Sequence, residues 1–99
     1  MRIIEEYVES FKMELYDAKD YAEKYLYFRA HGVEVYTTYF FKMASDELEH
    51  AEHLKQVASD EFEKLGKVCE LSEQERKEWG KACEEYDKSV VIVRQMLNM

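Results

Sequence analysis

Two glycines constrain this chain more than any other feature, because they divide its hydrophobic pattern into near-thirds. Gly32 and Gly66 separate segments in which apolar residues recur at alternating steps of three and four, and no proline interrupts them. That period is typical of an α-helix that buries one face, and no segment alternates as a strand does. The pattern predicts helices over about 3–30 and 34–65, each ended by its glycine. Together they form a long antiparallel hairpin over residues 1–65.

A third helix is predicted by its own start signal. Ser72 followed by Glu75 is a capping box, in which the hydroxyl and the carboxylate each satisfy an unpaired backbone donor. An apolar stripe then continues to Leu97, so the third helix spans 72–97. Gly80 inside it either permits close packing or makes this helix less stable. The fold class is therefore all-α, with residues 1–99 as a single domain.

Composition excludes several classes of protein. The 99 residues carry 14 Lys and Arg against 22 Asp and Glu, a net charge of −8, which disfavours nucleic acid as a partner. The longest uncharged run, residues 35–41, is far shorter than the ~20 residues that span a membrane, and no signal peptide is apparent. Cys69 and Cys83 lack ligand spacing and are expected to be reduced thiols of a cytoplasmic protein. So small a domain also needs regular packing, oligomerisation or a metal for stability.

Each predicted hairpin helix has one inward row of residues, and each row is apolar except near its middle. The row of the first helix is Ile4, Tyr7, Phe11, Glu14, Ala18, Tyr21, Tyr25 and Phe28. The row of the second helix is Tyr36, Phe40, Met43, Glu47, His50, Leu54 and Val57. A carboxylate in an apolar helix interface costs several kcal/mol unless it is paired, neutralised or bound to a cation. Three polar residues therefore require a common explanation.

The predicted turn brings these three residues to the same height. In a hairpin that turns near Gly32, residues whose numbers sum to about 64 lie side by side, so Glu14 is opposite His50 and close to Glu47. Glu47 and His50, at i and i+3, share one helix face. The three side chains then form candidate metal ligands. The alternatives are a Glu14 that is rotated outward or salt-bridged, and a Glu47–His50 pair that is hydrogen-bonded or solvated.

The segment 46–52, Asp-Glu-Leu-Glu-His-Ala-Glu, resembles the D-E-x-x-H-A segment on the second helix of ferritin-like proteins, particularly bacterioferritins and rubrerythrins. Glu14 lies 33 residues before Glu47, as the first-helix glutamate of that superfamily does, and Tyr21 matches a tyrosine often found there. The resemblance covers about residues 1–65. It implies a four-helix bundle that holds two iron ions.

One chain has only half of the ligands that such a site needs, because no histidine follows Gly66. Two copies related by a two-fold axis would supply four glutamates and two histidines. The chain thus resembles the encapsulated ferritins, short chains that form a di-iron centre between subunits, and a homodimer or a larger even-numbered oligomer is expected. An encapsulating shell is a further possible partner, although residues 95–99 do not resemble a targeting tail.

The resemblance also implies a role for each residue. It implies oxidation of Fe(II) to Fe(III) by O₂ or peroxide, with Glu47 as the bridging, catalytic ligand and with Glu14 and His50 as terminal ligands. Because Asp46 lies four residues before His50, it is also expected to accept the second imidazole proton of that His50 or of the partner chain's His50, or to be solvated. Tyr21 is a second candidate for this outer layer, with core packing as its alternative. Storage of mineral iron is not implied.

Two other functions fit the same residues. The hairpin is alternatively a non-catalytic interaction module in which buried polar residues fix the register of a partner helix. A structural zinc or manganese dimer would keep the site without the redox chemistry, and calcium fits least because it avoids imidazole. His53 lies on a charged flank and is expected to be solvated.

Overall fold

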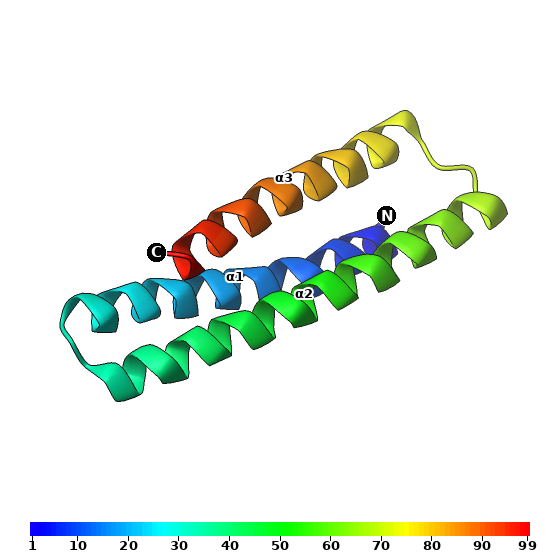
Figure 1. Ribbon diagram of the computed structural model, residues 1–99. Helices are drawn as coiled ribbons and strands as arrows, with labels where there is room; N and C mark the ends of the chain where they lie inside the picture. Colours follow the sequence, from blue (N-terminus) through cyan, green and yellow to red (C-terminus); the bar gives the residue numbers. More distant parts are fainter.

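The computed structural model describes residues 1–99 as three α-helices in a body of 54 × 18 × 17 Å (Figure 1). The helices are α1 (Arg2–Ala30), α2 (Glu34–Val68) and α3 (Glu73–Leu97), and the structure contains no strand. The predicted all-helical fold is confirmed. None of the helices is long and apolar enough to cross a membrane.

The two glycines that divide the sequence have different roles. Gly32 forms the α1–α2 turn with a φ of 70°, a left-handed conformation that glycine adopts without steric cost. Gly66 was expected to end the second helix, and this prediction is wrong: α2 continues through it to Val68. The helix ends instead at Cys69, whose backbone is extended. Glycine costs about 1 kcal/mol inside a helix, which the packing of a long helix readily offsets.

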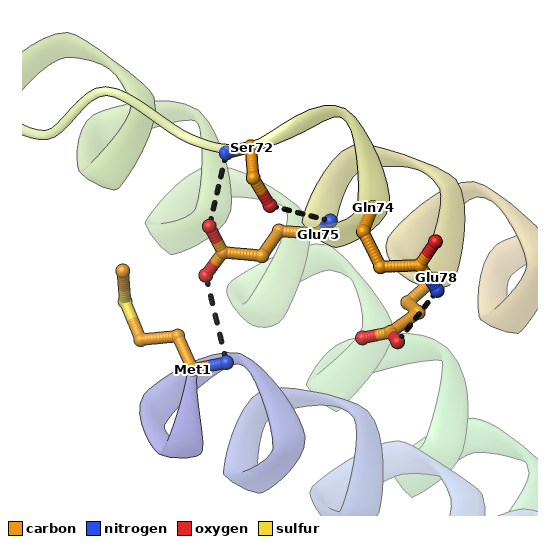
Figure 2. Close-up of polar contacts among 5 residues, drawn as sticks. All are labelled: Met1, Ser72, Gln74, Glu75 and Glu78. Atoms are coloured by element: carbon orange, nitrogen blue, oxygen red, sulfur yellow. Dashed lines mark hydrogen bonds and ion pairs between the residues drawn. The ribbon is translucent and has the colours of Figure 1, made fainter.

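The start of α3 is held by the predicted capping box (Figure 2). The Glu75 backbone N–H donates to Ser72 Oγ at 3.1 Å, and the Ser72 N–H donates to the Glu75 carboxylate at 2.9 Å. The amino group of Met1 lies 3.5 Å from the same carboxylate, which connects the start of α1 to the start of α3. Hydrogen bonds from Ser72 hold the pKa of Glu75 below its usual value.

The third helix lies along one side of the hairpin and runs parallel to α1. Its far end reaches Tyr25, whose hydroxyl donates to the Met99 carbonyl at 3.3 Å. The core between the helices is built around Phe11, which makes edge-to-face contacts with Trp79 and Tyr86 at 6.1 and 5.4 Å. These aromatic pairs attach α3 mainly to α1. The remaining buried members of this core are Leu15, Ala18, Ala22, Ala44, Leu48, Ala51, Ala58, Val90 and Val93.

The row expected to face inward on α2 is only partly buried, which corrects the sequence analysis. The residues of α2 that are buried are Ala44, Leu48, Ala51 and Ala58, and the predicted row lies beside them. Alanine lets two helix backbones approach closely, so the contact line follows small residues and leaves the larger ones at its margin. The row predicted for α1 agrees more closely with the structure, because every second member is buried, starting with Ile4 and Phe11.

The half-exposed members of both rows form one surface of the hairpin, which we call the open face. It consists of Tyr7, Glu14, Tyr21 and Phe28 from α1, of Tyr36, Phe40, Met43, Glu47, His50, Leu54 and Val57 from α2, and of Glu61, which follows Val57 at the next step of that row. Rings interlock across it near the turn, where Phe40 stacks on Tyr21 and Phe28 at 6.0 and 5.6 Å. The open face carries all three candidate metal ligands.

Candidate metal centre

The three polar residues singled out in the sequence converge in the structure. His50 Nδ1 lies 3.8 Å from Glu14 Oε2 and 3.7 Å from Glu47 Oε1. One donor atom from each residue lies within 4.8 Å of the other two. Glu14 comes from α1, and the other two come from successive turns of α2. The predicted hairpin register, which placed residues 14 and 50 side by side, is therefore confirmed.

The cluster lies on the side of the hairpin that α3 leaves free. Glu52 forms an ion pair with Arg94 of α3, so this part of α2 turns Glu52 toward α3. His50 precedes Glu52 by two residues, a rotation of about 200° around the helix, and it points away from α3. The side chains of Glu47, Glu14 and His50 are 18, 32 and 60% exposed. A second molecule therefore has access to the cluster.

The cluster brings two carboxyl groups close together, and this proximity changes the pKa of one of them. The pKa of Glu47 is raised to about 7, first by a hydrogen bond with Glu14, then by lost hydration and by the Glu14 charge. The His50 side chain lowers this pKa, and the charge of Asp17 raises it further. Near pH 7 Glu47 is therefore protonated in about half of the molecules, and a cation bound by Glu47 would have to displace this proton.

The two donor-atom gaps that involve His50 are short enough for one small cation to bridge. Two ligand atoms that each lie about 2.1 Å from an ion are at most ~4.2 Å apart. The Glu14–His50 and Glu47–His50 gaps of 3.8 and 3.7 Å fall inside that limit. Carboxylate oxygens with an imidazole nitrogen suit iron, manganese and zinc. Three donors leave positions free for a second copy, water or a reactant.

The surrounding residues only partly follow the sequence predictions. Asp46 accepts a hydrogen bond from Lys42 Nζ at 3.0 Å and makes no contact with His50 of its own chain. The Tyr21 ring lies on the open face, stacked on Phe40. Asp17, which raises the Glu47 pKa, was missed, although its position three residues after Glu14 places it on the same face.

Comparisons with protein-family models, curated proteins and solved structures found no match to this chain. The functional assignment therefore depends on the chemistry and geometry of the cluster.

Proposed function

We propose that this chain is a half-bundle iron protein in which Glu14, Glu47 and His50 of two copies together hold two iron ions. The convergence of two carboxylates and an imidazole on a half-exposed helical face is the observation that supports the proposal most strongly. A confined carboxylate pair that retains a proton is favoured as a cation site, because a divalent ion replaces the repulsion with attraction. The ferritin-like resemblance of residues 1–65 agrees with this ligand set.

A second copy supplies what one chain lacks. Three donors at an exposed site bind a transition metal incompletely, whereas two clusters related by a two-fold axis present four carboxylates and two imidazoles. This is the set that di-iron and di-manganese carboxylate bundles use. The second copy would also cover the apolar part of the open face.

The activity we propose is the oxidation of ferrous iron, which is the substrate. Two Fe(II) ions each lose one electron, and O₂ takes up both electrons with two protons and leaves as H₂O₂. Glu47 is the least exposed of the three ligands, so we assign it the position between the two ions. In each chain, Glu14 and His50 together bind one of the two ions as terminal ligands.

Iron stoichiometry and turnover test this proposal. The purified chain loaded anaerobically with Fe(II) should bind about one ion per chain. On exposure to air it should form Fe(III) faster than buffer alone does. Glu47→Ala should abolish both properties. Glu49→Ala is the matched control, because Glu49 is an exposed carboxylate two residues away and outside the cluster. Unchanged iron content in Glu47→Ala would overturn the proposal.

The same measurements separate the alternatives. A chain that binds Zn(II) or Mn(II) through Glu47 but does not accelerate Fe(II) oxidation would be a structural metal dimer. A chain that dimerises equally well with and without metal, and after Glu14→Ala, would be an interaction module in which the polar residues set the register.

A further inference from the structure

The spacing of the residues in the predicted row on α2 is symmetric along the helix. Metal binding by Glu47 and His50 does not by itself require this symmetry. With Glu61, which follows Val57 at the next four-residue step, the row has eight positions on the open face, separated by steps of 4, 3, 4, 3, 4, 3 and 4, a pattern that is identical in both directions. The centre of the pattern falls between Glu47 and His50. Residues at equal distances from this centre have numbers that sum to 97, namely Met43 with Leu54, Phe40 with Val57, and Tyr36 with Glu61.

These residues are available for a partner, because α3 does not cover them. Tyr36 and Val57 are 52 and 44% exposed. Phe40, Met43 and Leu54 are half-buried. An apolar row that is symmetric along one helix matches its own antiparallel image, so each large side chain meets a counterpart and not a gap.

We propose that a second copy docks on the open face with the two α2 helices antiparallel, so that residues whose numbers sum to about 97 meet across the two-fold axis. This inference depends on the proposed function only for the identity of the partner, a second copy. In this register Met43 packs against Leu54 of the second copy and Phe40 packs against its Val57. The Tyr36 hydroxyl reaches its Glu61 carboxylate. Glu47 lies beside the other copy's His50.

The first helix fits the same axis. A two-fold axis at the height of Glu14 exchanges α1 residues whose numbers sum to 28, which pairs Tyr7 of one copy with Tyr21 of the other. Both tyrosines are half-buried on the open face. Phe28, the other apolar α1 residue of the open face, has no counterpart in this pairing, so α1 contributes one pair of tyrosines on either side of Glu14.

Charge favours the antiparallel arrangement over a parallel one. The turn end of the hairpin, residues 24–42, has three cationic side chains and one carboxylate, Glu34. The opposite end, residues 1–9 together with 57–68, has six carboxylates and three cationic side chains, so its net charge is negative. Antiparallel docking brings each cationic end to an acidic end, whereas parallel docking would bring like ends together.

Cross-linking in EDTA tests the register without metal. In a Cys69→Ser/Cys83→Ser background, Met43→Cys and Leu54→Cys chains are mixed and oxidised. Within one helix these positions are about 16 Å apart, so only two chains can form the bond. We expect a disulfide-linked heterodimer, and none when either variant is oxidised alone.

Two control mixtures sharpen the result. Tyr36→Cys with Leu54→Cys shifts the register by seven residues, about 10 Å, and should not cross-link. Tyr21→Cys with Met43→Cys would cross-link only if α1 of one copy lay against α2 of the other, as in a parallel dimer. A bond in either control, together with none in the Met43–Leu54 mixture, would overturn the proposed register.

Dimer affinity provides a second readout. In EDTA, Phe40→Ala should raise the dimer dissociation constant at least tenfold, whereas Tyr16→Ala, which removes an exposed ring outside the open face, should change it less than twofold. Circular dichroism of both variants checks that the helices are retained. A wild-type chain that sediments as a monomer in EDTA would overturn the proposal, and its co-sedimentation with anionic lipid vesicles would instead assign the aromatic end to a membrane surface.

The outcomes of the two proposals remain distinguishable. A Met43–Leu54 cross-link in a chain that binds no iron would retain the docking surface and reject the iron function. Iron binding through Glu47 without that cross-link would retain the function and reject this register.

Discussion

Glu14 on α1 raises the pKa of Glu47 on α2 to about 7, first through a hydrogen bond and also through its charge, while lost hydration adds to the shift. The helix pairing that stabilises the hairpin thereby forces two carboxylates together at its mid-length. Without a cation, this arrangement costs stability that the surrounding apolar contacts must offset. Such a cost is typical of a binding site, because residues that bind a ligand often lower the stability of the ligand-free fold.

Glu47→Gln should therefore stabilise the metal-free protein while it abolishes metal binding. The raised pKa means that folded Glu47 holds its proton between about pH 4.5 and 7, where the unfolded chain has lost it. The wild type thus loses stability as pH rises through this window. Glutamine is neutral at every pH, so we expect similar stability at pH 5. At pH 8 we expect an advantage of on the order of 1–2 kcal/mol for the variant after solvent screening. Urea unfolding in EDTA at both pH values measures the difference, and a less stable variant at pH 8 would contradict this account.

Metal affinity should rise with pH across the same range. A cation bound by Glu47 must displace its proton, so the apparent affinity should increase by up to tenfold per pH unit below about pH 7 and level off above it. Calorimetric titration with Zn(II), which is stable in air, should also show proton release when it is repeated at pH 6 in buffers of different ionisation enthalpy. An affinity that does not change between pH 6 and pH 8 would show that Glu47 is not a ligand.

The helices could be predicted from the sequence more reliably than the packing between them. The Ser72 capping box and the Gly32 turn determine their elements through local hydrogen bonds and backbone conformation, and both were found. The predicted helix end at Gly66 was wrong because a glycine ends a helix only where its backbone becomes left-handed, and tertiary contacts determine whether that happens. The pattern of large apolar residues also concealed the alanine contact line of α2, which begins at Ala44.

More of the candidate site than of the helix packing could be predicted from the sequence. The proximity of Glu14, Glu47 and His50 follows from helix geometry and the position of one turn, so their residue numbers alone were enough to predict it. The Asp46–Lys42 pair could not be anticipated, because it is one of several ion pairs open to a surface carboxylate. The open face itself emerges only when burial distinguishes what α3 covers from what it leaves free.

Phe11→Ala should weaken the packing of α3 on the hairpin. The Phe11 ring is buried and contacts both Trp79 and Tyr86. Its removal should cost about 3–5 kcal/mol, a large part of the stability of a small domain. We expect a matching fall in the free energy of unfolding by urea and a red shift of Trp79 fluorescence, because Trp79 would lose its edge-to-face contact with Phe11 and retain only its stacking on Phe62 at 4.4 Å. Tyr16→Ala, on the exposed side of α1, should stay within about 0.5 kcal/mol of wild type.

Gly80→Ala should make α3 more stable. Of the two roles open to this glycine, close packing is excluded, because a Cβ added at Gly80 would meet no atom within 4 Å. The residue lies inside α3 with a helical backbone, so alanine adds helix propensity and limits the unfolded chain. We expect a gain of about 1 kcal/mol in the free energy of unfolding. The left-handed Gly32 is the matched control: Gly32→Ala should lower stability, since alanine is strained at a φ of 70°. If Gly80→Ala destabilised the chain, the solvent-facing position of this glycine on α3 would be wrong.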